Sequence, residues 1–257
     1  MLSNFSLRLV SAIILISIVF VSFYFGPIGV VILCGLISVL LYSEVLKNFG
    51  GYGANKFFLV LPAAGIVEAL FISNTLFVIL LFILVLIIGS YPKTFRWLRL
   101  LSLSYIFISQ YLFLTFICGV PSQLNIEQPL FLISIVIASD TGGYIFGNLF
   151  GRNKIAPSVS PNKTWEGLFG ANFLSLIVWA IIFRGFAENM ILEAILVVFL
   201  CFCSQIGDLL ESYAKRRLSL KDSGGLIPGH GGVFDRMDSL LGAVFGYSLI
   251  IALGFGV

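Results

Sequence analysis

Residues 205–239 read QIGDLLESYAKRRLSLKDSGGLIPGHGGVFDRMDS. This stretch holds five of the chain's twelve Asp and Glu residues, five of its fifteen Lys and Arg residues, and its only histidine, His230. The sequence on both sides of it is almost entirely apolar. Because charge is costly beside lipid, so dense a group of charges predicts a functional site in this stretch.

The composition points to lipid as the solvent. The 257 residues are 59% hydrophobic and only 11% charged, and the mean hydropathy is +1.09. Soluble domains carry about 25% charged residues, so an ordinary soluble fold is excluded. The net charge of +3 is small, and no basic run alternates with aromatic residues, so no nucleic-acid partner is expected.

Apolar segments of membrane-spanning length recur along the chain. A helix needs about 20 residues to cross about 30 Å of hydrocarbon, and on this measure the sequence predicts an all-α polytopic integral membrane protein with about nine transmembrane helices. The expected spans are 9–25, 27–46, 57–72, 75–91, 100–120, 129–150, 168–184, 192–214 and 239–256.

Basic residues indicate the orientation of these spans. With the N-terminus in the cytoplasm, 14 of the 15 Lys and Arg residues lie on the cytoplasmic side, and only Arg184 lies outside. Positive charge collects in cytoplasmic loops, so the C-terminus is expected on the outer side. Residues 205–239 then face the cytoplasm, where nucleotides and magnesium are found.

The two parts of the chain differ in character. Residues 1–125 contain few polar groups within their spans and are expected to be transmembrane scaffold, with lipid contacts and a dimer surface. Glu44 and Glu68 lie near helix ends there, and a structural role is expected for both. Residues 126–257 are expected to form the catalytic transmembrane region with its cytoplasmic loops.

Polar residues appear before the charged stretch as well. Asp140 lies in the middle of the expected span 129–150, where a carboxylate needs a partner or a wet cavity. It is read as functional, with a buried structural hydrogen bond as the alternative. Lys163 belongs to a basic loop, and Glu166 near the next helix start is favourable to the helix dipole.

One helical face of the charged stretch carries acid, hydroxyl and base together. Asp208, Glu211, Ser212 and Lys215 are spaced i, i+3, i+4 and i+7, which places them on one face. Carboxylate oxygens suit Mg²⁺, and Lys and Arg suit phosphate. The pattern therefore predicts phosphoryl or nucleotidyl transfer. A cytoplasmic loop with surface ion pairs is the alternative.

A glycine-rich loop follows this helix and ends at a second pair of acids. Glycines allow backbone N–H groups to approach an anion, but the loop does not match a Walker A pattern. His230 lies within it and is either a phosphate contact or a polar residue in a wet loop. Asp235 and Asp238 are three residues apart, on one face of the last helix.

These motifs together resemble the signature of phosphatidate cytidylyltransferases, also called CDP-diacylglycerol synthases. The matching segments are Ser212-x-x-Lys215-Arg216, Lys221-Asp222 and His230-Gly231-Gly232-x-x-Asp235-Arg236-x-Asp238, together with Ser139-Asp140-Thr141-Gly142 and Ser160-Pro161-x-Lys163-Thr164-x-Glu166-Gly167. The motifs run from about 139 to 239, and hydropathy and length extend the resemblance to the whole chain.

The resemblance implies a reaction and its partners. CTP and phosphatidic acid would give CDP-diacylglycerol and pyrophosphate, as a step of phospholipid biosynthesis. The enzyme would depend on Mg²⁺, with a second cation left open, and would be a homodimer. Its location would be the bacterial cytoplasmic (inner) membrane, with the active site facing the cytoplasm.

The resemblance also assigns residues to roles. The implied metal ligands are Asp208 and Asp235, with Ser212 and Asp238 close by, and the implied catalytic residues are Asp208, Asp235, Asp238 and Lys215. Substrate and phosphate contacts are expected from Ser212, Lys215, Arg216, Lys221, His230, Arg236, Lys163 and Asp140. If one ion is shared, the carboxylates of Asp208 and Asp235 should lie within roughly 6–8 Å of each other.

Two other functions remain open from the sequence. One is another lipid-active transferase or kinase that uses CTP or ATP with the same metal chemistry. The other is an ion-coupled transporter with Asp140 and Asp208 on its ion path. Many transporters contain paired repeats, and none is visible in this sequence.

Overall fold

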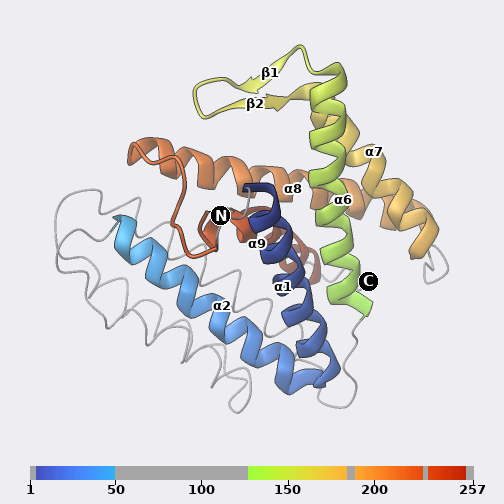
Figure 1. Cartoon of the computed structure of the whole chain (residues 1–257). Helices are drawn as coiled ribbons and strands as arrows, with labels where there is room; N and C mark the ends of the chain where they lie inside the picture. Colours follow the sequence, from blue (N-terminus) through green and yellow to red (C-terminus); the bar gives the residue numbers. More distant parts are fainter. Residues whose placement is uncertain (1–3, 50–126, 184–188, 228–230, 253–257) are drawn as a thin grey trace. The chain divides into compact units, whose positions relative to one another are not determined.

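The computed structural model describes residues 4–49, 127–183, 189–227 and 231–252, and these are mostly helical (Figure 1). The elements are α1 (Asn4–Tyr24), α2 (Gly26–Phe49), α6 (Glu127–Phe150), β1 (Lys154–Ala156), β2 (Ser160–Thr164), α7 (Trp165–Ile182), α8 (Met190–Arg217) and α9 (Phe234–Ala252). The expectation of a mainly α-helical chain is thereby confirmed.

The chain divides into two compact units. The first combines Met1–Leu124 with Leu218–Arg236, and the second combines Asn125–Arg217 with Met237–Val257. In the first unit, α1 packs against α2. Gly26 joins them at a φ of +66°, a conformation that glycine adopts without steric cost.

In the second unit, α6 packs along α7 (Figure 1). The helices approach closely because glycines face each other: a Cβ on Gly142 would collide with the carbonyl oxygen of Gly170. Leu132 and Ile135 on α6 are fully buried. The Ser175 hydroxyl on α7 donates a 3.1 Å hydrogen bond to the carbonyl oxygen of Ile135.

A short antiparallel hairpin, β1–β2, connects α6 to α7 (Figure 1). The sequence indicates only a basic loop here, because the two strands are short and polar, so the hairpin was not predicted. The carboxylate of Glu166 holds its base, because it accepts hydrogen bonds from the backbone N–H groups of Arg152 and Asn153. Thr164 ends β2 and caps α7 by accepting from the N–H of Gly167 at 3.1 Å. This geometry fixes the strand that carries Lys163.

Three of the described helices are long and apolar enough to cross a membrane: Leu130–Phe150, Trp165–Ile182 and Met190–Arg217. Their outer faces expose large apolar side chains, such as Leu149 and Ile191 at 70% and 75% exposure. Such a surface suits a lipid solvent rather than water. Several of the other expected spans fall on residues 50–126, outside the described residues.

Candidate functional site

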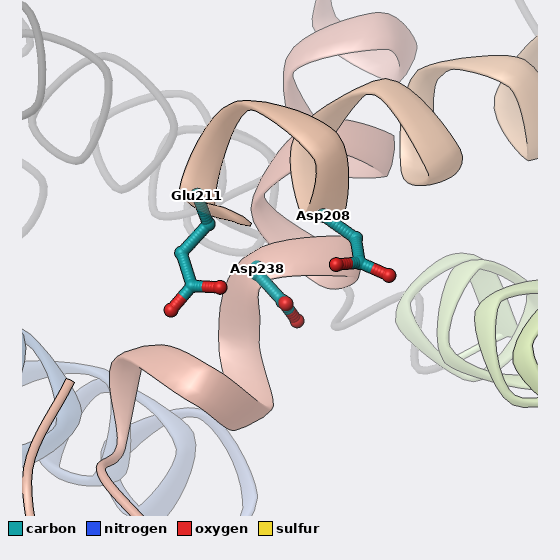
Figure 2. Close-up of side chains that lie close together, drawn as sticks. All are labelled: Asp208, Glu211 and Asp238. Atoms are coloured by element: carbon teal, nitrogen blue, oxygen red, sulfur yellow. The ribbon is translucent and has the colours of Figure 1, made fainter. Parts of the chain in front are cut away.

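Three carboxylates converge where α8 meets α9 in the second unit. Asp208 and Glu211 lie on one face of α8, and Asp238 comes from α9 and lies between them (Figure 2). One carboxylate oxygen from each residue lies within 4.8 Å of the others. Helical spacing predicted that Asp208 and Glu211 share one face, and the family resemblance implied that Asp238 lies close to the metal ligands.

Asp208 is linked to a cation and a hydroxyl. Its Oδ2 lies 2.8 Å from the ammonium nitrogen of Lys163 on β2, and its Oδ1 accepts a 3.3 Å hydrogen bond from Ser212. The Lys163 ammonium also donates to the backbone carbonyl and the side-chain oxygen of Gln205, both at 3.1 Å. Lys163 therefore lies within the acidic site, next to Asp208.

Glu211 and Lys215 form an ion pair one helical turn apart on α8. The ammonium nitrogen lies 2.7 Å from Oε2 of Glu211. The Glu211 side chain is only 1% exposed and that of Lys215 is 14% exposed. Since a buried carboxylate is costly without a partner, Lys215 supports Glu211 as well as offering positive charge to the site.

Asp238 precedes the last expected span, 239–256, and accepts a 2.8 Å hydrogen bond from the N–H of Ser239. Burial, together with the neighbouring carboxylate of Asp208, raises the pKa of Asp238 to about 7. The Ser239 hydroxyl donates to Oδ1 of Asp140 at 3.2 Å, which brings Asp140 to the edge of the same site. A cation that binds here would favour the ionised carboxyl group of Asp238.

Four residues that take part in these contacts were not expected as site residues from the sequence: Glu211, Ser139, Gln205 and Ser239. Glu211 was recognised as part of the helical face but was not expected to be a ligand. The side-chain amide nitrogen of Gln205 donates a 3.2 Å hydrogen bond to the hydroxyl of Ser139 on α6. The Ser239 hydroxyl on α9 donates to Asp140 on α6. Ser139 belongs to the matching segment that begins with it but was given no role of its own, whereas Gln205 and Ser239 are the two ends of the charged stretch 205–239.

Other expected site residues lie around this network or in the first unit. Arg216 is exposed, and its Nε donates to the carbonyl oxygen of Val159 in the hairpin turn at 3.3 Å. Lys221 and Arg236 are exposed residues of the first unit. His230 lies outside the described residues.

Asp235 also belongs to the first unit and is held by backbone groups. Its Oδ2 accepts from the N–H of Ser223 at 2.9 Å and from the N–H of Gly232 at 2.8 Å. The structure thus gives Asp235 a loop-fixing contact that the sequence did not suggest. Asp208 belongs to the second unit and Asp235 to the first. The expected distance between their carboxylates therefore stays a prediction.

The donor set of the second unit suits a hard divalent cation beside phosphate. Three carboxylates and the Ser212 hydroxyl offer oxygen ligands, which is the ligand type that Mg²⁺ prefers. Lys163 and Lys215 place positive charge at the same location. Such a site can bring anionic reactants together and stabilise charge on phosphoryl oxygens.

Comparisons with known proteins agree with this chemistry. The sequence pattern of the cytidylyltransferase family matches residues 6–253. The phosphatidate cytidylyltransferase of Staphylococcus saprophyticus is 46% identical over 114 residues, which are 44% of this chain and 44% of that protein. The phosphatidate cytidylyltransferase of Haemophilus influenzae is 39% identical over 180 residues, 62% of this chain and 61% of that protein. The aligned segment thus spans 44% and 61% of the length of these two relatives.

Proposed function

This chain belongs to the cytidylyltransferase family, and we propose that it transfers the cytidylyl group of CTP to phosphatidate. The products would be CDP-diacylglycerol and pyrophosphate. The observation that carries the proposal is the group of Asp208, Glu211 and Asp238, whose ligand oxygens lie within 4.8 Å of one another, with Lys163 bound to it. The names of the relatives support the choice of substrates.

The proposed cofactor is Mg²⁺, with a second cation left open. Asp208, Glu211 and Asp238 would hold it, with Ser212 close by, and the family resemblance adds Asp235 as a ligand. When bound, the ion would neutralise phosphate charge and polarise a phosphoryl oxygen. The three closely spaced carboxylates would otherwise repel one another, which is the physical reason that the group fits a cation.

The proposed reaction needs positioning more than proton transfer. A phosphate oxygen of phosphatidate attacks the α-phosphorus of CTP, the bond from that phosphorus to the bridging oxygen breaks, and pyrophosphate leaves. The attacking group is already an anion, so no strong base is required. Lys163, Lys215 and Arg216 would hold the phosphates in place with charge-assisted hydrogen bonds.

Purified protein tests this proposal. Incubation with CTP, phosphatidate and Mg²⁺ should give CDP-diacylglycerol and pyrophosphate, and omission of any one component should abolish the product. Replacing phosphatidate with diacylglycerol or a polyprenol tests the alternative lipid acceptors. Product from one of those lipids alone, with none from phosphatidate, would contradict the proposal.

The site is proposed to face the cytoplasm of the bacterial inner membrane, in a protein of about nine spans with its N-terminus inside and its C-terminus outside. Phosphatidate would stay in the leaflet while CTP arrives from the cytoplasm. The family resemblance supports a homodimer, which light scattering of the detergent-solubilised protein would test.

This topology predicts the result of labelling single cysteines. Cysteines introduced near Lys93 and near Glu127, in a background without the four native cysteines, should react with impermeant reagents from opposite sides of the membrane. The reason is that the expected span 100–120 separates the two positions. Labelling of both from the same side would contradict the topology and the cytoplasmic location of the site.

Substitution of the two basic residues on α8 should have separable effects. Arg216→Ala should raise KM for CTP or phosphatidate while leaving the protein folded, because the Arg216 side chain is exposed and its guanidinium is available to substrate phosphate. Lys215→Ala should also lower the thermal stability, since it leaves the buried Glu211 carboxylate without its ion pair. The measurements are substrate titrations and melting of the purified variants. Normal turnover by both variants at sub-saturating substrate would assign these residues to the membrane surface instead.

A further inference from the structure

Helix α2 in the first unit carries a buried carboxylate, Glu44, which is only 4% exposed. Its Oε1 accepts a 2.9 Å hydrogen bond from the N–H of Val233, and its Oε2 accepts one of 2.9 Å from the N–H of Phe234. The hydroxyl of Ser223 donates to Oε2 at 3.2 Å. One side chain near the start of the sequence therefore binds both ends of the described part of the glycine-rich loop.

These contacts stabilise the N-terminus of helix α9 by accepting hydrogen bonds from its first backbone N–H groups. Phe234 is the first residue of α9, and the first N–H groups of a helix have no partner within it. A carboxylate there satisfies two of these donors and interacts favourably with the positive end of the helix dipole. Glu44 supplies that carboxylate from another helix, which fixes the position of the start of α9 relative to α2.

Two glycines, Gly224 and Gly232, leave room for the Glu44 carboxylate because they have no Cβ atom. A Cβ on Gly224 would lie 2.6 Å from Oε1 of Glu44, and a Cβ on Gly232 would lie 2.7 Å from Oε2. A Cβ on Gly232 would also collide with the Ser223 hydroxyl oxygen. Two glycines of the loop are thus required by the close approach of Glu44, independently of any turn.

A second carboxylate holds the same backbone from the side of α9. Asp235 accepts hydrogen bonds from the N–H groups of Ser223 and Gly232. Ser223 consequently contacts both acids, through its hydroxyl to Glu44 and through its N–H to Asp235. Glu44 and Asp235 therefore hold the same residue, Ser223, from two sides.

We propose that Glu44 is a positioning residue for the cytidylyl-transfer site. Its carboxylate fixes Ser223 and the start of α9, and through them it sets the orientation of Asp235, which the family resemblance makes a metal ligand. The inference rests on the proposed function, and it gives the apolar N-terminal part of the chain a role beyond scaffold.

The test uses the full-length protein and Glu44→Gln. The amide keeps the shape of the side chain but removes its charge. Its NH₂ group would replace one acceptor oxygen and would face the hydrogen-bond donors of the loop, so at least one of the contacts that Glu44 makes would be lost. Backbone hydrogen exchange at Val233 and Phe234 should accelerate. Turnover should fall about 10–100-fold and the Mg²⁺ concentration for half-maximal activity should rise, on the scale of losing a group that orients metal ligands. Glu44→Asp, which keeps the charge, should recover part of the loss.

The matched control is Ser43→Ala on the same helix. The Ser43 hydroxyl bonds only the carbonyl oxygen of Leu40 in its own helix in the described contacts, so exchange, turnover and Mg²⁺ dependence should stay as in the wild type. Gly224→Ala is the second variant, because its Cβ would lie 2.6 Å from Oε1 of Glu44 and would displace the carboxylate without altering Glu44. It should reproduce the effects of Glu44→Gln, and it carries the test if Glu44→Gln does not fold.

Two results would overturn the inference. Unchanged hydrogen exchange in Glu44→Gln would show that Glu44 does not hold the start of α9. Faster exchange with unchanged turnover and Mg²⁺ dependence would limit Glu44 to a structural role. If the wild-type protein makes no CDP-diacylglycerol, the proposed function fails, whereas the exchange measurement still decides whether the anchor exists.

Discussion

Asp208→Asn should lower kcat for CDP-diacylglycerol formation by at least about 10²-fold, the scale of losing one preorganised electrostatic contact. Asp208 lies in the acidic group and contacts both Lys163 and Ser212. Its amide replacement keeps the size of the side chain and one oxygen, but removes the charge that a cation and the Lys163 ammonium share. The effect is expected in kcat, since the lost charge would stabilise the reacting phosphates.

Glu193→Gln is the matched control for this change. Glu193 lies on the same helix, α8, and accepts a 2.9 Å hydrogen bond from the indole nitrogen of Trp179. It lies in the first turn of α8, whereas Asp208 lies near the other end. The control should keep wild-type turnover. An Asp208→Asn enzyme as active as Glu193→Gln would remove Asp208 from the proposed mechanism.

Asp235→Asn should also cost at least about 10²-fold in turnover, and its response to Mg²⁺ should identify the cause. If Asp235 is a direct ligand, as the family resemblance implies, excess Mg²⁺ should recover little activity. If it acts by holding the N–H groups of Ser223 and Gly232, the remaining amide oxygen preserves one acceptor and excess Mg²⁺ should recover more.

The comparison requires a full Mg²⁺ titration for the wild type and the Asp235→Asn variant at saturating CTP. Hydrogen exchange at Ser223 and Gly232 reports the loop contacts independently of turnover. An active Asp235→Asn enzyme with unchanged Mg²⁺ dependence would contradict both roles of this carboxylate.

Local periodicity made part of the site predictable from sequence. Asp208, Ser212 and Lys215 follow helical spacing, so their shared face could be read directly, and the structure places them on α8. Asp140 and Lys163 were expected near the substrate. In the structure Asp140 accepts a hydrogen bond from the Ser239 hydroxyl, and Lys163 forms an ion pair with Asp208. In these cases the pattern of charged residues in an apolar chain carried the information.

Contacts between distant segments could not be predicted in the same way. Glu44 binds residues that follow it by 179 to 190 positions, and no local period reports such a contact. The β1–β2 hairpin is short and polar, so hydropathy did not reveal it. The loop-fixing contacts of Asp235 depend on backbone N–H groups, which every residue except proline carries.

The most direct measurement follows the phosphorus atoms of CTP. Purified protein is given phosphatidate, Mg²⁺ and CTP labelled with ³²P at either the α or the γ position. The account predicts that the α label enters the lipid-extractable product as CDP-diacylglycerol, while the γ label stays in water as pyrophosphate. Transfer of the γ label to lipid, or no phosphatidate-dependent labelling of lipid from either position, would contradict cytidylyl transfer by this chain.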